Sequence, residues 1–180
     1  LLEELGGVPI LRRVVLEVGR SKAQALVVVT GHERGRVEAA VAGLDVEFVH
    51  NPRYADGIST SIGAGIGALD PAAVEGALVV LGDMPEVAAA DVDRLIAAFA
   101  PTEGRGICVP VRGGRRGNPV LWGGHHFAGL TQLDGDIGAR HLIAANADDV
   151  HEVEIGSDGI FADVDTPDLL SAVRKRLRDS

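Results

Sequence analysis

The sequence predicts an α/β fold in which helices cover both faces of a mostly parallel sheet. Short runs rich in β-branched residues alternate with amphipathic stretches of helical length, which is typical of such a sheet. The composition agrees, because 46% of the 180 residues are hydrophobic and only 3% are aromatic, which favours a packed aliphatic core. The chain contains no internal repeat and no linker-like tract, so residues 1–180 are expected to form one domain.

The expected strands and helices follow one another along the chain. The strands lie at residues 26–29, 46–49, 77–81 and 107–109, and two helices lie at residues 9–18 and 91–99. Pro9 suits the first position of a helix, where a missing N–H costs nothing, and Thr166 and Pro167 begin a last helix in the same way. Gly113 and Gly114 predict a hairpin turn between two extended segments that run from Val111 to Val120. A parallel sheet also needs a strand before its first crossover helix, so we expect a further strand upstream of Leu1.

Composition and spacing exclude several classes of protein. The chain has 17 basic and 26 acidic residues and a net charge of −9, which argues against binding to duplex nucleic acid. Its apolar runs are too short to cross a bilayer and no signal peptide precedes them, so we expect a soluble, cytoplasmic protein. The single cysteine, Cys108, cannot form an intramolecular disulfide, and neither Lys22 nor Lys175 follows a phosphate-binding glycine-rich loop. The adjacent pair His125 and His126 has no third ligand at a suggestive spacing.

Acidic residues mark two candidate sites, one directly after an expected strand and one leading into the expected last helix. In parallel sheets ligands bind beyond the carboxyl ends of the strands, where Gly82 and Asp83 directly follow residues 77–81. Alternation in an extended segment points Asp163 and Asp165 to the same side. These carboxylates suit a hard cation such as Mg²⁺, although an acid that caps a helix or turn explains either place without a metal.

A polar loop and a set of arginines could bind the anionic part of a substrate. Residues 51–61 precede a helix whose small residues leave N–H groups open to an anion or a base edge. Gly63, Gly65 and Gly67 have the wrong spacing for a dinucleotide fingerprint, and we expect them to let the helix approach its sheet. The arginines at positions 112, 115, 116 and 140 could clamp phosphate oxygens, but a solvated basic loop explains them equally well.

Six motifs in this order resemble the MobA-like nucleotidyltransferases. They are Asn-Pro at 51–52, Gly-Ile-Ser-Thr-Ser-Ile at 57–62, Leu-Gly-Asp-Met-Pro at 81–85, Arg-Gly-Asn-Pro-Val at 116–120, Gly-Asp-Ile-Gly-Ala-Arg at 135–140 and Asp-Val-Asp-Thr-Pro-Asp at 163–168. Within that superfamily the combination is most similar to the molybdenum cofactor cytidylyltransferases. The resemblance implies a three-layer α/β/α nucleotidyltransferase (Rossmann-like) fold. It also implies Mg²⁺-dependent transfer of CMP from CTP to the phosphate of molybdopterin, with release of pyrophosphate.

The resemblance also implies a role for individual residues. Asp83 and Asp165 would be the catalytic carboxylates that hold Mg²⁺. The nucleotide would be bound by Gly57, Ser59, Ser61 and Gly82, and the pterin side would be lined by Asn118, Pro119, Asp136 and Arg140. Members of the superfamily begin with a strand and a glycine-rich loop followed by a lysine, which cradle the triphosphate. We expect these before Leu1.

Two alternatives stay open on the sequence. One is a guanylyl or cytidylyl transferase that uses GTP or CTP and acts on another small phosphate, such as a sugar or polyol phosphate, because a fold does not fix a substrate. The other is a non-catalytic nucleotide- or pterin-binding module that hands the cofactor to an apo-molybdoenzyme.

Overall fold

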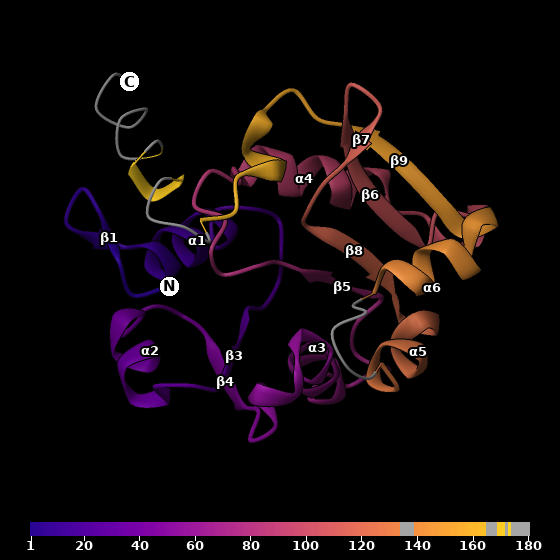
Figure 1. The fold of residues 1–180 in the computed structure, drawn as a ribbon. Coiled ribbons are helices and arrows are strands. Elements are labelled where there is room, and N and C mark those ends of the chain that lie inside the picture. Colours follow the sequence, from indigo (N-terminus) through magenta and orange to yellow (C-terminus); the bar gives the residue numbers. More distant parts are fainter. Residues whose placement is uncertain (134–138, 165–168, 172, 174–180) are drawn as a thin grey trace.

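The computed structural model describes residues 1–133, 139–164, 169–171 and 173 (Figure 1). The first part of the chain contains β1 (Glu4–Leu5), β2 (Val8–Pro9), α1 (Ile10–Val18), β3 (Val27–Thr30), α2 (Arg34–Ala40), β4 (Glu47–His50), α3 (Ile58–Gly67), β5 (Gly76–Val79) and α4 (Ala89–Ala98). The second part contains β6 (Ile107–Arg112), β7 (Arg115–Arg116), β8 (Val120–Gly123), α5 (Phe127–Thr131), α6 (Arg140–Ala145) and β9 (Val150–Glu154). Short 3₁₀ helices include η3 (Gly124–His126), η5 (Ala147–Asp149) and η6 (Asp158–Phe161). No helix in these ranges is long and apolar enough to cross a membrane.

The central strands form one pair and one larger mixed sheet. β3 and β4 pair in parallel, from Val27 opposite Glu47 to Thr30 opposite His50. In the larger sheet β8 lies between β5 and β6 and runs antiparallel to both, whereas β9 pairs with β6 in parallel. β5, β6 and β9 therefore all run in the same direction, as a mostly parallel sheet requires, and their carboxyl ends share one edge.

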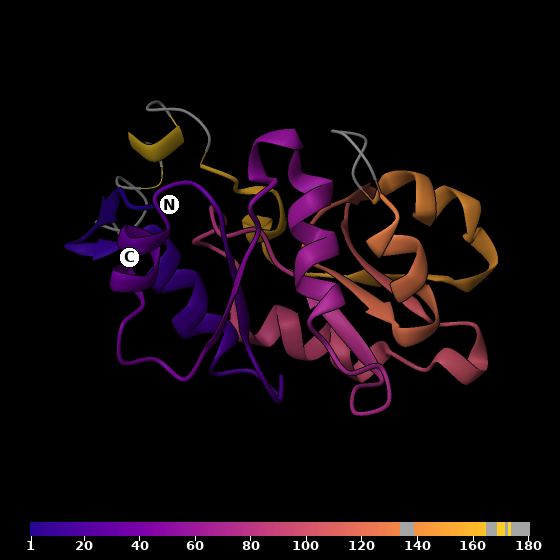
Figure 2. The same cartoon turned by 90° about the horizontal axis from the view of Figure 1, so that it is seen from below.

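Helices cover both faces of the larger sheet, which confirms the three-layer prediction. Alternate residues of β6 point to opposite faces. Ile107 packs in one cluster with Ile66 of α3, whereas Cys108 packs in another with Leu95 of α4. Figure 1 shows α3 and α4 on opposite sides of the strands, and in Figure 2, which is seen from below, α3 lies in front. Trp122, which is 1% exposed, belongs to the cluster on the α3 side.

The sequence predicts that three glycines let α3 approach its sheet, and the structure confirms this for one of them. A Cβ on Gly65 would lie 2.9 Å from Cγ2 of Val29 in β3, so a larger residue there would push the helix from the strand. A Cβ on Gly63 would lie 3.6 Å from Cα of Thr131 in α5. That distance is an ordinary van der Waals contact, and Gly67 has no neighbour within 4 Å, so close approach explains only Gly65.

The predicted hairpin is present but shorter than the sequence suggests. Gly113 and Gly114 have φ angles of 58° and 77°, the left-handed region that a two-residue turn of this kind needs. Val111 pairs with Arg116, so the second arm ends there. Val120 begins β8, which leaves the hairpin and pairs with β5 and with the start of β6.

Cys108 should be unreactive in the folded protein. Its side chain is fully buried, and burial raises the pKa of the thiol to about 11, so almost no thiolate forms at neutral pH. We expect no reaction with Ellman's reagent at pH 8 in buffer and one equivalent of reaction in guanidinium chloride. Rapid reaction of the native protein would show that β6 opens to solvent.

Candidate functional site

Asp83 lies just beyond the carboxyl end of β5, where the sequence predicts it. Its Oδ1 atom is buried, and its backbone carbonyl accepts a hydrogen bond of 3.0 Å from the N–H of Val164. The segment that carries Asp163 is therefore bonded to the loop that carries Asp83. Asp165, the next residue after Val164, lies outside the described residues.

Asn118 and Pro119 reach the same edge of the sheet. They directly precede Val120, which pairs with Val79 at the carboxyl end of β5. Asn118 is half-buried, and its backbone N–H donates to the carbonyl of Ile160 in η6 over 3.0 Å. The start of β8, η6 and the loop after β5 thus meet at one place.

The contact between η6 and the loop after β5 is close, and the sequence did not single it out. Gly159 is buried, and a Cβ there would lie 2.1 Å from the carbonyl oxygen of Glu86. No motif or periodicity marks this glycine, because its need for a small residue arises from a neighbour that is remote in sequence. Gly82, which the sequence does single out, is less tightly enclosed, since a Cβ there would meet only the side-chain ends of Leu1 and Leu11, at 3.0 and 3.2 Å.

The loop before α3 is held by Asn51, which is 3% exposed. Its Nδ2 donates to the hydroxyl oxygens of Thr60 and Ser61 over 2.8 and 3.0 Å, and its Oδ1 accepts from the N–H of Arg53. Gly57 is the N-cap of α3 and has a φ of 111°, which favours glycine. It offers no capping side chain, and its carbonyl oxygen accepts a hydrogen bond of 3.2 Å from the N–H of Thr60 in the first turn of α3.

The other predicted binding residues differ in exposure. Ser59 is 0% exposed, so its side chain faces the protein interior, whereas Ser61 is partly exposed next to Asn51. Arg140 is exposed at the first position of α6, a helix that packs on the Trp122 cluster through Leu142. Asp136 lies outside the described residues.

The arginines of the hairpin bind other parts of this chain. Arg112 Nε lies 2.8 Å from Oδ1 of Asp158, and Arg116 Nε lies 2.7 Å from Oε1 of Glu152. The guanidinium of Arg115 lies over the ring of Phe161, 4.3 Å from its centre. These contacts tie the hairpin to β9 and η6, and they favour a structural role over a phosphate clamp.

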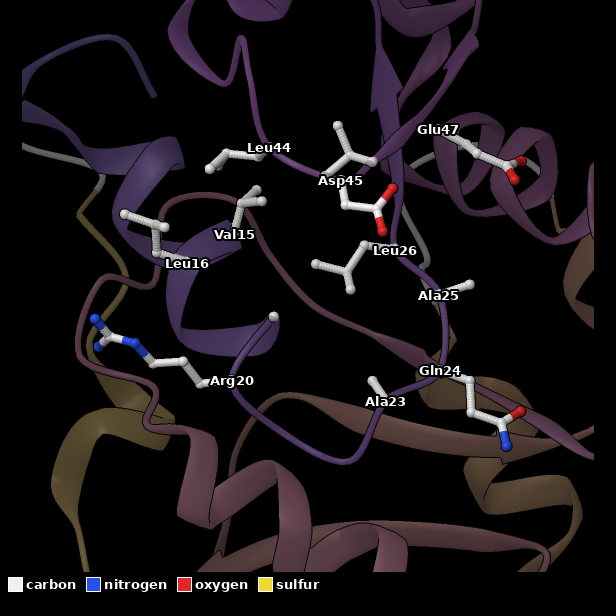
Figure 3. A pocket seen from close by; sticks show the side chains of 12 residues that line it. Val15, Leu16, Arg20, Ala23, Gln24, Ala25, Leu26, Leu44, Asp45 and Glu47 are labelled. Atoms are coloured by element: carbon white, nitrogen blue, oxygen red, sulfur yellow. The ribbon is translucent and has the colours of Figure 1, made fainter.

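A hollow of about 520 Å³ lies elsewhere, between the end of α1 and the starts of β3 and β4 (Figure 3). Val15 and Leu26 form part of its wall, and Asp45 and Glu47 add acidic groups. It is at the opposite end of these strands from the loop that Asn51 holds. It therefore does not coincide with the residues predicted to bind nucleotide.

Comparison with known proteins agrees with this architecture. Over 152 residues the chain is 27% identical to the molybdenum cofactor cytidylyltransferase of Escherichia coli K12, an alignment that covers 84% of this chain and 74% of that protein. A nucleotidyl transferase from Methanothermobacter thermautotroptrophicus superimposes with a TM-score of 0.86 at 25% identity, covering 100% of this chain and 86% of that one. A homologue of Mycobacterium tuberculosis rv0371c from Mycobacterium sp. strain JC1 gives a TM-score of 0.85 at 26% identity, covering 99% and 88%.

The family assignment rests on sequence as well as fold. The MobA-like NTP transferase domain matches residues 1–150, which include the loop before α3, the Asp83 loop and the Asn118 segment. These three segments hold four of the six motifs that carry the resemblance. The chain belongs to the MobA-like NTP transferase domain family, whose fold and chemistry are those of a nucleotidyltransferase.

Proposed function

We propose that this protein transfers CMP from CTP to the phosphate of molybdopterin and releases pyrophosphate, with Mg²⁺ held by Asp83 and Asp165. The observation that carries the proposal is the hydrogen bond from Val164 to the carbonyl of Asp83, because it joins the two acidic segments at the carboxyl edge of the sheet. The similarity to the Escherichia coli molybdenum cofactor cytidylyltransferase supports the choice of both substrates.

The residues at this edge fit a hard divalent cation. Mg²⁺ prefers carboxylate oxygens together with phosphate oxygens of the substrate, and Asp83 presents a carboxylate with a buried Oδ1. The chain carries a net charge of −9, which by itself repels a triphosphate. When bound, the ion would neutralise charge on the triphosphate and on the departing pyrophosphate.

The chain's other residues would orient the two substrates. Gly57 and Ser61 would contact the nucleotide at the start of α3, while the buried Ser59 and Asn51 hold the loop in shape. Asn118, Pro119 and Arg140 would line the acceptor side. An oxygen of the acceptor phosphate attacks the α-phosphorus of CTP, the bond to the bridging oxygen breaks, and pyrophosphate leaves. Such transfer depends mainly on position and electrostatics, so it needs no covalent nucleophile.

Pyrophosphate release from the purified protein tests this proposal. With Mg²⁺ and molybdopterin we expect release with CTP and none with GTP. Release with GTP alone would contradict cytidylyl transfer. Release only when molybdopterin is replaced by a sugar or polyol phosphate would contradict the proposed acceptor. Nucleotide binding without release in any mixture would favour a non-catalytic binding module.

A further inference from the structure

Two histidines and an aspartate converge at the edge of the larger sheet that lies opposite Asp83. Nε2 of His125 and Nε2 of His126 each lie 2.7 Å from Oδ2 of Asp149. The three ligand atoms all lie within 4.8 Å of one another. His125 and His126 form the end of η3 after β8, and Asp149 ends η5 just before β9. The cluster therefore joins segments that are more than twenty residues apart in sequence.

Two glycines leave the space that the side chains of this cluster occupy. A Cβ on Gly106 would lie 2.2 Å from Oδ2 of Asp149 and 2.7 Å from Cε1 of His125. A Cβ on Gly123 would lie 2.9 Å from the same Cε1 atom. The N–H of Gly106 also donates to the other carboxylate oxygen, Oδ1 of Asp149, over 2.9 Å. The two glycines thus make room for the side chains, and one of them fixes the carboxylate.

The electrostatics favour an ionised carboxylate facing two imidazoles. Burial opposes ionisation, but hydrogen bonds from His125, His126 and the N–H of Gly106 outweigh it and lower the pKa of Asp149. An ionised carboxylate only accepts hydrogen bonds, so both imidazoles direct their Nε2 donors at the same oxygen.

This arrangement has the composition of a transition-metal site with an open position. Two imidazole nitrogens and one carboxylate oxygen are a common protein ligand set for Zn²⁺, and a hydrogen bond to the second carboxylate oxygen orients such a ligand. The side chain of His126 is 9% exposed and that of Asp149 is 21% exposed, whereas that of His125 is 52% exposed. Water can therefore reach the cluster past His125.

We propose that His125, His126 and Asp149 bind a divalent transition-metal ion of the Zn²⁺ class, with water as a fourth ligand. Tetrahedral Zn²⁺ with ligands at about 2.1 Å separates the donor atoms by about 3.4 Å. The two 2.7 Å contacts to Asp149 must therefore each widen by about 0.7 Å, through rotation of the half-exposed His125 and a shift of the Asp149 carboxylate away from His126. Each Nε2 then offers its lone pair to the ion: its proton passes to solvent, and Nδ1 carries the proton of the neutral ring.

The ion would link the end of β8 to the starts of β6 and β9. Ile107 pairs with both Trp122 and Val150, so the cluster lies where these three strands meet. Asp83 follows the opposite end of β5, and the two sites therefore differ in place and in ligand chemistry. Imidazole ligands favour Zn²⁺ or Co²⁺, whereas Mg²⁺ favours oxygen ligands. We expect this ion to stabilise the fold and to take no part in nucleotidyl transfer.

Cobalt binding tests the proposal on untagged protein that has been stripped with a chelator. In excess Mg²⁺ we expect one equivalent of Co²⁺ to bind, with the visible absorption of a four-coordinate site, and Zn²⁺ to displace it. His125→Ala and Asp149→Asn should each weaken binding by about tenfold or more. His141→Ala removes an exposed histidine outside the cluster and should leave binding unchanged, as should Asp83→Asn.

Thermal unfolding supplies a second measurement. Because an ion that binds only the folded state stabilises it, Zn²⁺ should raise the unfolding temperature of the wild-type protein. Zn²⁺ should raise the unfolding temperature of His125→Ala much less. Because His125 is half-exposed, its replacement should not prevent folding. The proposal is overturned if the wild-type protein binds no Co²⁺ at micromolar concentration. It is equally overturned if His125→Ala and Asp149→Asn bind Co²⁺ as tightly as wild type. The three side chains would then form a hydrogen-bonded cluster that binds no metal.

Discussion

An Asp83→Asn protein should lose turnover by a factor on the order of a thousand while keeping its fold. The substitution preserves the volume of the side chain but removes the negative charge proposed to hold Mg²⁺ against the triphosphate. A metal ion stabilises charge in the transition state by several kcal/mol, and about 4 kcal/mol corresponds to a factor of about a thousand in rate. Pyrophosphate release with CTP and molybdopterin measures the loss.

The matched control is Asp45→Asn. Asp45 is an exposed aspartate that lines the hollow near the start of β4, away from the proposed nucleotide site, and its replacement should leave turnover unchanged. Thermal unfolding of both variants checks that each one folds. If Asp83→Asn retained wild-type turnover, Asp83 would not be a metal ligand and the assignment of this edge as the active site would be wrong.

Gly159→Ala should damage both stability and turnover, although it adds a single methyl group. The new Cβ would lie 2.1 Å from the carbonyl oxygen and 2.7 Å from the carbonyl carbon of Glu86, so backbone atoms must move. Overpacking of this kind costs about 1–3 kcal/mol of unfolding free energy. The displaced loop also carries Asp83, and a misplacement of about 1 Å at a reacting centre can cost about a hundredfold in rate.

Gly156→Ala provides the comparison, because a Cβ at Gly156 has no neighbour within 4 Å. It should leave both the urea midpoint and the rate of pyrophosphate release close to wild type. Equal stability and turnover of Gly159→Ala and Gly156→Ala would mean that η6 does not hold the Asp83 loop in place.

Local pattern predicted much of the fold, because strand and helix signals act over a few residues. The run at 107–109 marks β6, and the amphipathic stretch at 91–99 corresponds to α4, one or two residues earlier than expected. β9 escaped notice because Val150 and Val153 are its only aliphatic residues among His and Glu, and its burial depends on pairing with β6.

Site residues could likewise be predicted where their position depends on nearby residues, and not where it depends on contacts that are remote in sequence. The position of Asp83 follows from a local rule, since polar residues that follow a buried parallel strand reach the carboxyl edge of the sheet. The hairpin arginines show the limit of that rule, because Arg112 and Arg116 pair with Asp158 and Glu152, which are 46 and 36 residues away. Nothing near an arginine in the sequence shows whether the fold supplies its counter-charge.

The sequence by itself determined the α/β class, the order of the main strands and the membership of the MobA-like NTP transferase family, since all of these depend on periodicity and on spacing along the chain. Only the tertiary structure decided that Val164 bonds to Asp83, that Gly159 packs against Glu86, and that the adjacent histidines meet Asp149. Each of these contacts joins segments that are remote in sequence, and their geometry is fixed by strand pairing and by the space that particular glycines leave.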